Sequence, residues 1–106
     1  MIEHRQRVLD ALNHKSTDRV PIDFGGTYTT TIFYAAYERL KMELGMANSE
    51  TQIYSKTRRL AIPDEVVLKR FDIDTRFLGL GAYQGDQNEI DEDNYLDEWG
   101  TTWKKA

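Results

Sequence analysis

The chain has 106 residues, 40% of them hydrophobic and 30% charged, with a net charge of −4 and a pI near 5.1. An acidic chain without a clustered basic face argues against a nucleic-acid partner, and no run approaches the roughly 18 apolar residues of a membrane span. The lack of cysteine excludes disulfides and thiolate metal ligands, and with no signal-like apolar stretch at the start we expect a cytoplasmic protein.

The first two elements are predicted as a helix followed by a strand. Residues 2–14 place apolar side chains on one side of a helix and charged ones on the other, which predicts an amphipathic helix. Residues 20–24 form a short extended run with proline near its start and are bounded by Gly25 and Gly26. This pattern is typical of a strand.

The middle of the chain contains the clearest helical pattern. Apolar residues recur at three- and four-residue spacing after Thr29 or Thr30, either of which can cap the helix, and Gly45 ends it. Residues 46–60 are mixed and polar, so no regular element is predicted there. The basic residues of this stretch, Lys56, Arg58 and Arg59, are expected on a solvated loop.

Three elements are predicted in the second half. Residues 63–71 begin with proline and two acidic residues, which favours a short helix. Residues 74–80 are predicted as a second strand, and residues 94–105, where aromatic and polar residues alternate, as a surface hairpin. The alternation of helices and strands predicts an α/β fold with parallel strands.

Several site patterns fail when they are tested. The acidic run in residues 85–98 lacks the ligand and glycine spacing of a calcium loop and is interpreted as a solvated loop. His4 and His14 stand at opposite ends of the first helix, so they are interpreted as surface histidines and no metal site is predicted. Asp23 and Arg76 each lie on a predicted strand, where they either share a ligand-facing cavity or form structural ion pairs.

Four stretches resemble uroporphyrinogen decarboxylase-like proteins, on the side of the corrinoid-dependent methyltransferases. They are residues 5–14 (RQRVLDALNH), 18–26 (DRVPIDFGG), 71–76 (FDIDTR) and 97–103 (DEWGTTW). The resemblance implies that residues 1–106 are the N-terminal portion of such a domain. The expected fold is therefore an incomplete N-terminal part of a TIM (β/α)8 barrel with a small C-terminal β-hairpin.

The resemblance also implies what the intact protein does. The leading expectation is methyl transfer from a corrinoid protein with a zinc-activated thiol, and the less favoured one is decarboxylation of uroporphyrinogen. The isolated chain, with too few strands to enclose a pocket, is expected to be inactive and to contain no cofactor of its own. The expected substrate-binding residues are Asp23, Gly25, Gly26 and Arg76, and self-association or a complementary chain is the expected protein contact.

An alternative from a different functional class remains open. The chain could be a non-catalytic α+β interaction module that uses Tyr95, Trp99 and Trp103 as an aromatic contact surface. The same aromatic residues could instead pack within their own hairpin.

Overall fold

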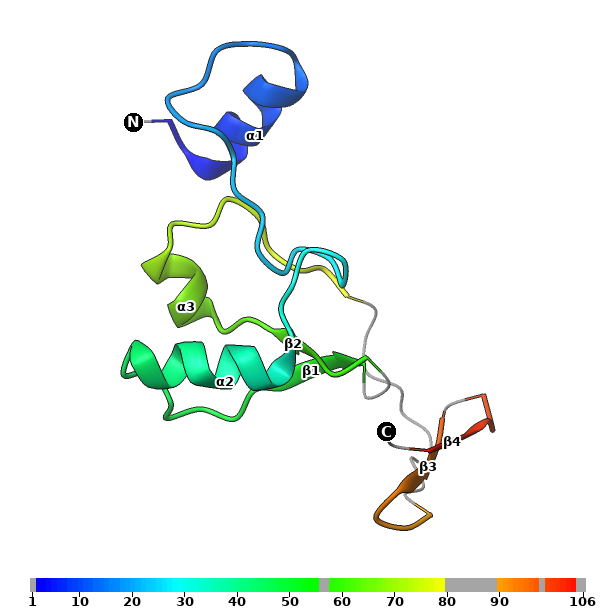
Figure 1. Ribbon diagram of the computed structural model, residues 1–106. Helices are drawn as coiled ribbons and strands as arrows, with labels where there is room; N and C mark the ends of the chain where they lie inside the picture. The colour runs from blue at the N-terminus through cyan, green and yellow to red at the C-terminus, as the bar shows by residue number, and fades with distance from the viewer. Residues whose placement is uncertain (1, 56–57, 80–89, 98, 105–106) are drawn as a thin grey trace.

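A computed structural model describes residues 2–55, 58–79, 90–97 and 99–104 of the chain. Three helices and two hairpins follow one another in these ranges (Figure 1): α1 (His4–Leu12), α2 (Tyr34–Glu43), β1 (Gln52–Ser55), β2 (Leu60–Ile62), α3 (Glu65–Arg70), β3 (Asn94–Leu96) and β4 (Thr102–Lys104). The strands pair antiparallel, β1 with β2 and β3 with β4.

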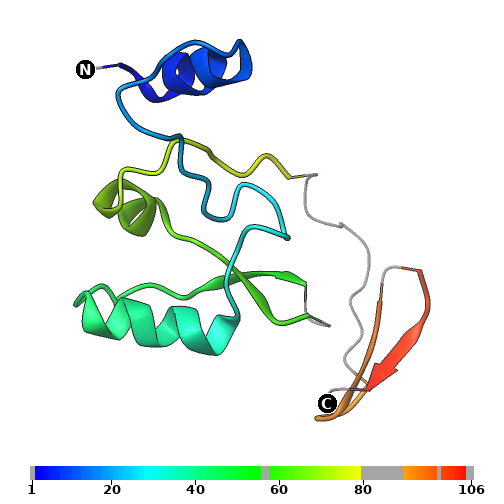
Figure 2. The ribbon, with the colours of Figure 1, turned by 45° about the horizontal axis from the view of Figure 1, so that its top comes forward.

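The predicted α/β fold and barrel fragment are wrong. The described residues form a small α+β domain in which both sheets are antiparallel hairpins. None of the described residues of the predicted strands 20–24 and 74–80 forms a strand, and residue 80 lies outside the described ranges. These two segments run side by side as extended chain instead (Figures 1 and 2).

A side chain explains why no ladder forms between these two segments. The backbone N–H of Asp74 donates to the Ile22 carbonyl at 3.0 Å, as it would in a sheet. The Ile22 N–H, however, donates to the Asp74 carboxylate at 2.8 Å, and Pro21 has no N–H to donate. A ladder needs backbone partners on successive residues, so the pairing stops after one bond.

The core lies between α2, the β1–β2 hairpin and α3 (Figure 1). Tyr37, Ala61 and Val67 are buried together, one from each of these elements. The chain just before α2 joins the hairpin through the Phe33–Leu60 bridge. Because residues before Tyr34 are used in this extended pairing, α2 begins later than the predicted cap at Thr29 or Thr30.

Most of the other predicted elements are confirmed. Helices α1 and α3 lie inside the predicted segments 2–14 and 63–71, and Gly45 follows α2 with a φ of +67°. The 94–105 hairpin is present as β3 and β4, with Tyr95 opposite Trp103, and residue 105 lies outside the described ranges. The β1–β2 hairpin of residues 52–62 is an addition, because no regular element was predicted in 46–60. Arg58 and Arg59 are exposed at its turn as expected, and Lys56 lies outside the described ranges.

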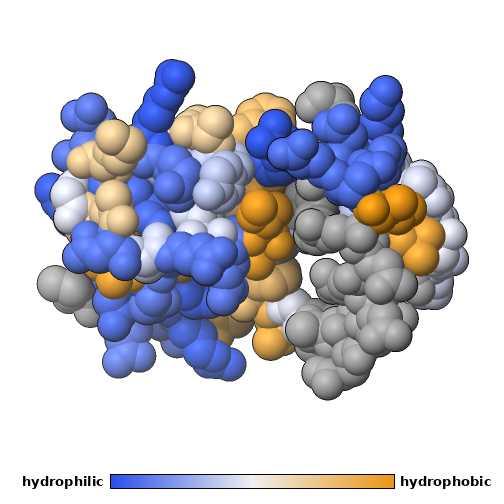
Figure 3. Space-filling model, turned by 90° about the horizontal axis from the view of Figure 1, so that it is seen from below, coloured by the Kyte–Doolittle hydropathy of each residue, from blue (hydrophilic) through white to orange (hydrophobic). Residues whose placement is uncertain are grey.

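Much apolar surface remains uncovered. In the view from below, apolar residues form a band across the middle of the face (Figure 3). Large exposed apolar side chains occur along the whole chain, for example Leu12, Val20, Phe33, Leu78 and Trp99. None of the described helices is long and apolar enough to cross a membrane.

Candidate functional site

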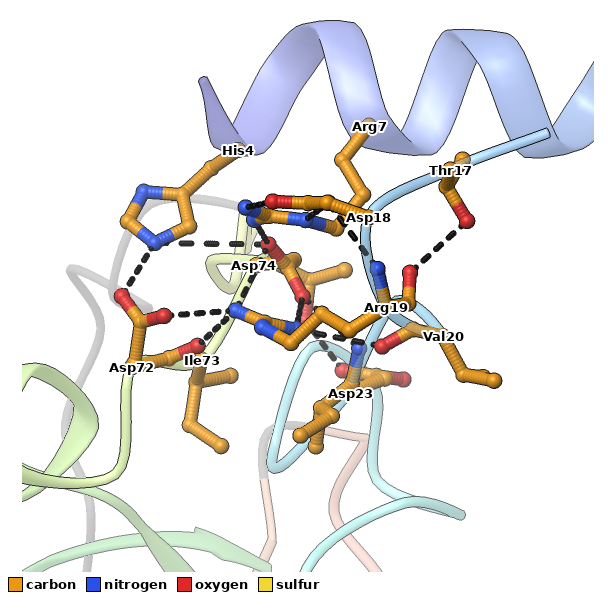
Figure 4. A network of polar contacts seen from close by, with 12 residues as sticks. His4, Arg7, Thr17, Asp18, Arg19, Val20, Asp23, Asp72, Ile73 and Asp74 are labelled. Atoms are coloured by element: carbon orange, nitrogen blue, oxygen red, sulfur yellow. Dashed lines mark hydrogen bonds and ion pairs between the residues drawn. The ribbon is translucent and has the colours of Figure 1, made fainter. Parts of the chain in front are cut away.

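A buried carboxylate organises the polar centre of the molecule (Figure 4). The Asp74 side chain is 0% exposed and accepts hydrogen bonds from Arg7 Nη1 and Arg19 Nη1, both at 2.5 Å. Burial alone would raise the pKa of Asp74, but the bonds from the Ile22 N–H and the two guanidinium groups lower it to about 2. Asp74 is therefore a carboxylate shared between two cations.

Arg7 reaches this carboxylate from α1. Its side chain is 3% exposed, and its Nε also donates to Asp18 at 2.7 Å. The hydrogen bond that Arg7 donates to Asp18, followed by the one it donates to Asp74, raises the pKa of Arg7, and the bond from Arg7 lowers the pKa of Asp18. This pair fastens the loop after α1 to the middle of the helix.

Asp72 extends the network to the surface. Arg19 Nη2 donates to Asp72 Oδ2 at 2.7 Å, and His4 Nε2 lies 2.7 Å from Asp72 Oδ1. The bond from Arg19 and then that from His4 lower the pKa of Asp72. We call the six residues of this network the Asp74 cluster: His4, Arg7, Asp18, Arg19, Asp72 and Asp74. The cluster holds segments 19–24 and 72–77 side by side.

Asp23 is held at the end of these paired segments. Its Oδ1 accepts hydrogen bonds from the Gly26 N–H at 3.0 Å and from the Thr75 hydroxyl. Partial burial raises the pKa of Asp23, but bonds from Thr75, Thr30 and Gly26 outweigh this effect and lower the pKa overall. The Asp23 carboxylate is therefore ionised at neutral pH, and it links the 23–26 turn to segment 72–77.

The turn after Asp23 depends on two glycines. Gly25 has a φ of +78°, and a Cβ at this position would lie 2.5 Å from the Pro63 ring. A Cβ on Gly26 would lie 2.5 Å from Asp23 Oδ1. The Tyr54 hydroxyl donates to the Gly25 carbonyl, which ties β1 to this turn.

An open groove of about 560 Å³ lies beside this turn. It is lined by Gly26, Thr27, Tyr28, Tyr54, Arg58, Phe77, Leu78 and Gly79. The rings of Tyr54 and Phe77 meet edge to face, with centroids 4.3 Å apart and planes at 82°. The Arg58 guanidinium lies 5.1 Å from the centre of the Tyr28 ring. The groove thus combines aromatic walls with one guanidinium among its lining residues.

The four predicted site residues are divided between two places. Gly26 lines the groove, and Gly25 and Asp23 form the turn that carries Gly26. Arg76 instead forms an ion pair with Glu65, with Nε 2.8 Å from Oε2, and lines a separate groove under α1. Asp23 and Arg76 therefore do not line the same groove among the grooves formed by the described residues.

Tyr54 and Phe77 were missed by reasoning from the sequence. Burial, followed by the charge of Asp23, raises the pKa of Tyr54, so its hydroxyl stays protonated as a donor. The signals near them in the sequence were Arg58, which was predicted on a loop, and Arg76, which directly precedes Phe77 on the predicted strand 74–80. Their meeting across the groove depends on the tertiary fold, because Tyr54 lies on β1 and Phe77 follows segment 72–76.

The zinc implied by the resemblance finds no fitting ligands in the described part of the chain. Within those residues no group of three or more histidine, cysteine or carboxylate side chains could hold a metal ion. The described residues can bind and orient a ligand through aromatic contact, a guanidinium and hydroxyl groups. No protein-family model, curated protein or solved structure matches the chain.

Proposed function

We propose that the groove beside Gly26 binds a flat ligand with an anionic edge, and that the chain is the substrate-binding part of a uroporphyrinogen decarboxylase-like enzyme. The observation that carries this proposal is the pairing of the Tyr54 and Phe77 rings with the Arg58 guanidinium around one groove. Corrinoid-linked methyl transfer is the leading activity for the intact protein, and uroporphyrinogen decarboxylation is the less favoured one.

The shape and chemistry of the groove favour such a ligand. Its volume of about 560 Å³ lies in the usual range of small-molecule sites, roughly 300–1,000 Å³. At Gly26 and Gly79 the space that a Cβ would occupy is filled by the Asp23 carboxylate and by the Phe77 ring, so the two glycines let these groups pack against the backbone of the groove. A guanidinium binds carboxylates and phosphates through two parallel hydrogen bonds, so Arg58 suits an anionic edge of either kind on the ligand.

The same geometry supports binding rather than turnover by this chain. The Asp23 carboxylate contacts Gly26 of the groove lining, but its Oδ1 is occupied by the Gly26 N–H and the Thr75 hydroxyl. Tyr54 donates its proton to the Gly25 carbonyl. We therefore assign these two residues to shaping the groove, and we expect the purified chain to bind its ligand without converting it.

Absorbance titration with hydroxocobalamin and with uroporphyrin tests this proposal. Phe77→Ala and Arg58→Ala should each weaken binding of the preferred macrocycle about tenfold or more. Phe71→Ala is the matched control for Phe77→Ala, because Phe71 is 42% exposed and Phe77 is 41% exposed. Arg39→Ala on α2 is the control for the loss of positive charge in Arg58→Ala. Equal effects of the Phe71 and Phe77 substitutions, or no binding of either macrocycle, would contradict the proposal.

A specific observation favours a second candidate, the non-catalytic interaction module. Trp99, in the turn between β3 and β4, is 85% exposed, whereas Tyr95 of the same hairpin is buried. Trp103 is held by a hydrogen bond from Nε1 to Asp97 Oδ2 at 2.7 Å. Exposed tryptophan is enriched at protein contact sites. Sedimentation of the wild type and Trp99→Ala tests self-association, which the substitution should weaken if this surface is the contact.

A further inference from the structure

Helix α1 contributes almost nothing apolar to the core. Its one buried side chain is Arg7, a charged residue. The core residues and the apolar residues packed against them all come from the chain after α1: Tyr37, Ala61, Val67, Phe24, Ile32, Leu40 and Met46. Apolar burial is the usual attachment of a helix to its domain, so α1 must be attached in another way.

Open grooves flank α1 where it meets the rest of the chain. One, of about 420 Å³, is lined by Ile2, Glu3, His4, Arg5, Arg7 and Asp72. The other, of about 610 Å³, is lined by His4, Arg5, Val8, Leu9, Asp74, Thr75 and Arg76. Figures 1 and 2 both place α1 away from α2 and the β1–β2 hairpin. The helix thus rests on polar side chains with space beside them.

We propose that α1 is a detachable arm, which undocks and redocks as one unit while α2, α3 and the β1–β2 hairpin stay folded. The Asp74 cluster is the latch that holds the arm. Arg7 and His4 are the residues of α1 in this cluster, and they contact Asp74 and Asp72 on the other side (Figure 4).

Asp74 is the residue on which the latch depends. Its carboxylate lies between the guanidinium groups of Arg7 and Arg19, which otherwise repel each other. Replacement of Asp74 by asparagine keeps the shape of the side chain but removes the negative charge. Arg7, which is buried, and Arg19, which is partly exposed, then keep only Asp18 and Asp72 as carboxylate partners and lose the charge that lies between them, so the substitution favours the undocked arm.

Undocking joins the two grooves into one surface. The apolar side chains of Val8 and Leu9, which face the second groove, become accessible together with the segment that contains Asp72 and Thr75. A helix of nine residues is only marginally stable in isolation, so the released arm also loses its helical hydrogen bonds. Amide exchange is therefore a direct measure of undocking.

Native-state hydrogen exchange of the full wild-type chain in low denaturant tests whether the arm is independent. Amides of residues 7–12, which donate within α1, should exchange through an opening that depends little on denaturant, at least tenfold faster than the most protected amides of α2. If the α1 and α2 amides share one opening rate and one denaturant dependence, the arm does not exist and the proposal is wrong.

The latch is tested by substitution. In Asp74→Asn the α1 amides should exchange about tenfold faster than in the wild type, while protection of α2 and α3 is kept. Asp93→Asn removes a carboxylate from the exposed loop before β3 and serves as the control. Should Asp74→Asn lower protection everywhere, Arg7→Met decides, because it removes the contact of α1 with Asp74 and leaves Asp74 paired with Arg19. Unchanged exchange of α1 in both variants, or uniform loss in both, would overturn the assignment.

Discussion

Tyr37 and Asp64 form two hydrogen bonds with each other between α2 and the start of α3. The Tyr37 hydroxyl donates to Asp64 Oδ2 at 2.8 Å and accepts from the Asp64 backbone N–H at 2.7 Å. Burial, the largest effect, raises the pKa of Tyr37, so the hydroxyl remains protonated. One phenol therefore satisfies both groups at the beginning of α3.

Tyr37→Phe should destabilise the protein, because it leaves the Asp64 N–H without its acceptor beside the core. The expected loss is about 1–3 kcal/mol in the free energy of unfolding, measured by urea denaturation. Tyr34→Phe removes a hydroxyl from the same helix outside this pair and should have a smaller effect. Equal losses in the two variants would show that the double hydrogen bond does not matter.

Lys41 is a completely buried cation, with an exposed fraction of 0%. Its Nζ donates to the Ser49 carbonyl at 2.7 Å and to Thr51 Oγ1 at 2.9 Å, and it lies 3.2 Å from Asp64 Oδ2. Lys41→Met keeps the aliphatic stem but leaves these oxygens without a donor. The substitution should lower the free energy of unfolding by about 3 kcal/mol, the lower end of the range for breaking a buried ion pair, because Asp64 retains some exposure.

Lys69→Met is the control for Lys41→Met. Lys69 is exposed on α3 and lies 3.9 Å from Glu65 in an i,i+4 pair, which contributes only about 0.3–0.5 kcal/mol. Urea denaturation of both variants checks the difference. A similar small decrease in the free energy of unfolding in the two variants would mean that the contacts of Lys41 do not stabilise the protein.

Acid should weaken the protein through Asp74. Its pKa is lowered from 3.8 to about 2 in the folded chain, so folding favours the deprotonated carboxylate. The stabilisation is complete above the unfolded value of 3.8 and is lost as the pH falls through 2. Urea denaturation between pH 5 and pH 2 (roughly the range of carboxyl titration) should show a smaller pH dependence in Asp74→Asn than in the wild type. Identical pH profiles would contradict this assignment.

Two glycines with positive φ differ in their surroundings. A Cβ on Gly25 would meet the Pro63 ring at 2.5 Å, whereas a Cβ on Gly45 would meet nothing within 4 Å. Gly45→Ala should therefore lower the free energy of unfolding by about 1–2 kcal/mol, which is the cost of the left-handed backbone conformation alone, and Gly25→Ala should lower it by more. Thermal denaturation compares them. A Gly25→Ala variant as stable as Gly45→Ala would show that the Pro63 contact is easily relieved.

The helices could be predicted from the sequence because their apolar spacing is local. The 94–105 hairpin could also be predicted from its alternation of aromatic and polar residues. The rest of the strand pattern could not, for a different reason at each place. Segments 20–24 and 74–79 have strand-like composition, but the Asp74 carboxylate takes the Ile22 N–H that a ladder needs. The β1–β2 hairpin turns at Arg59 with a φ of +52°, a position where arginine gives no turn signal.

The candidate groove was partly visible in the sequence. The Gly25-Gly26 pair and Asp23 pointed to a turn that approaches a ligand, and the structure places Gly26 in the groove wall. The aromatic walls could not be predicted, since Tyr54 and Phe77 are 23 positions apart in the sequence and their rings come into contact only after the fold has formed. Likewise, nothing local shows that Arg76 faces Glu65.

The distance along the chain between Arg7 and Asp74 has a consequence for the order of folding during synthesis. These residues are 67 positions apart, whereas Tyr37 and Asp64 are separated by 27. Closing the longer loop is entropically less favourable, and it must wait until the ribosome has made residue 74. The helix that is translated first should therefore be the last of the three to find its place.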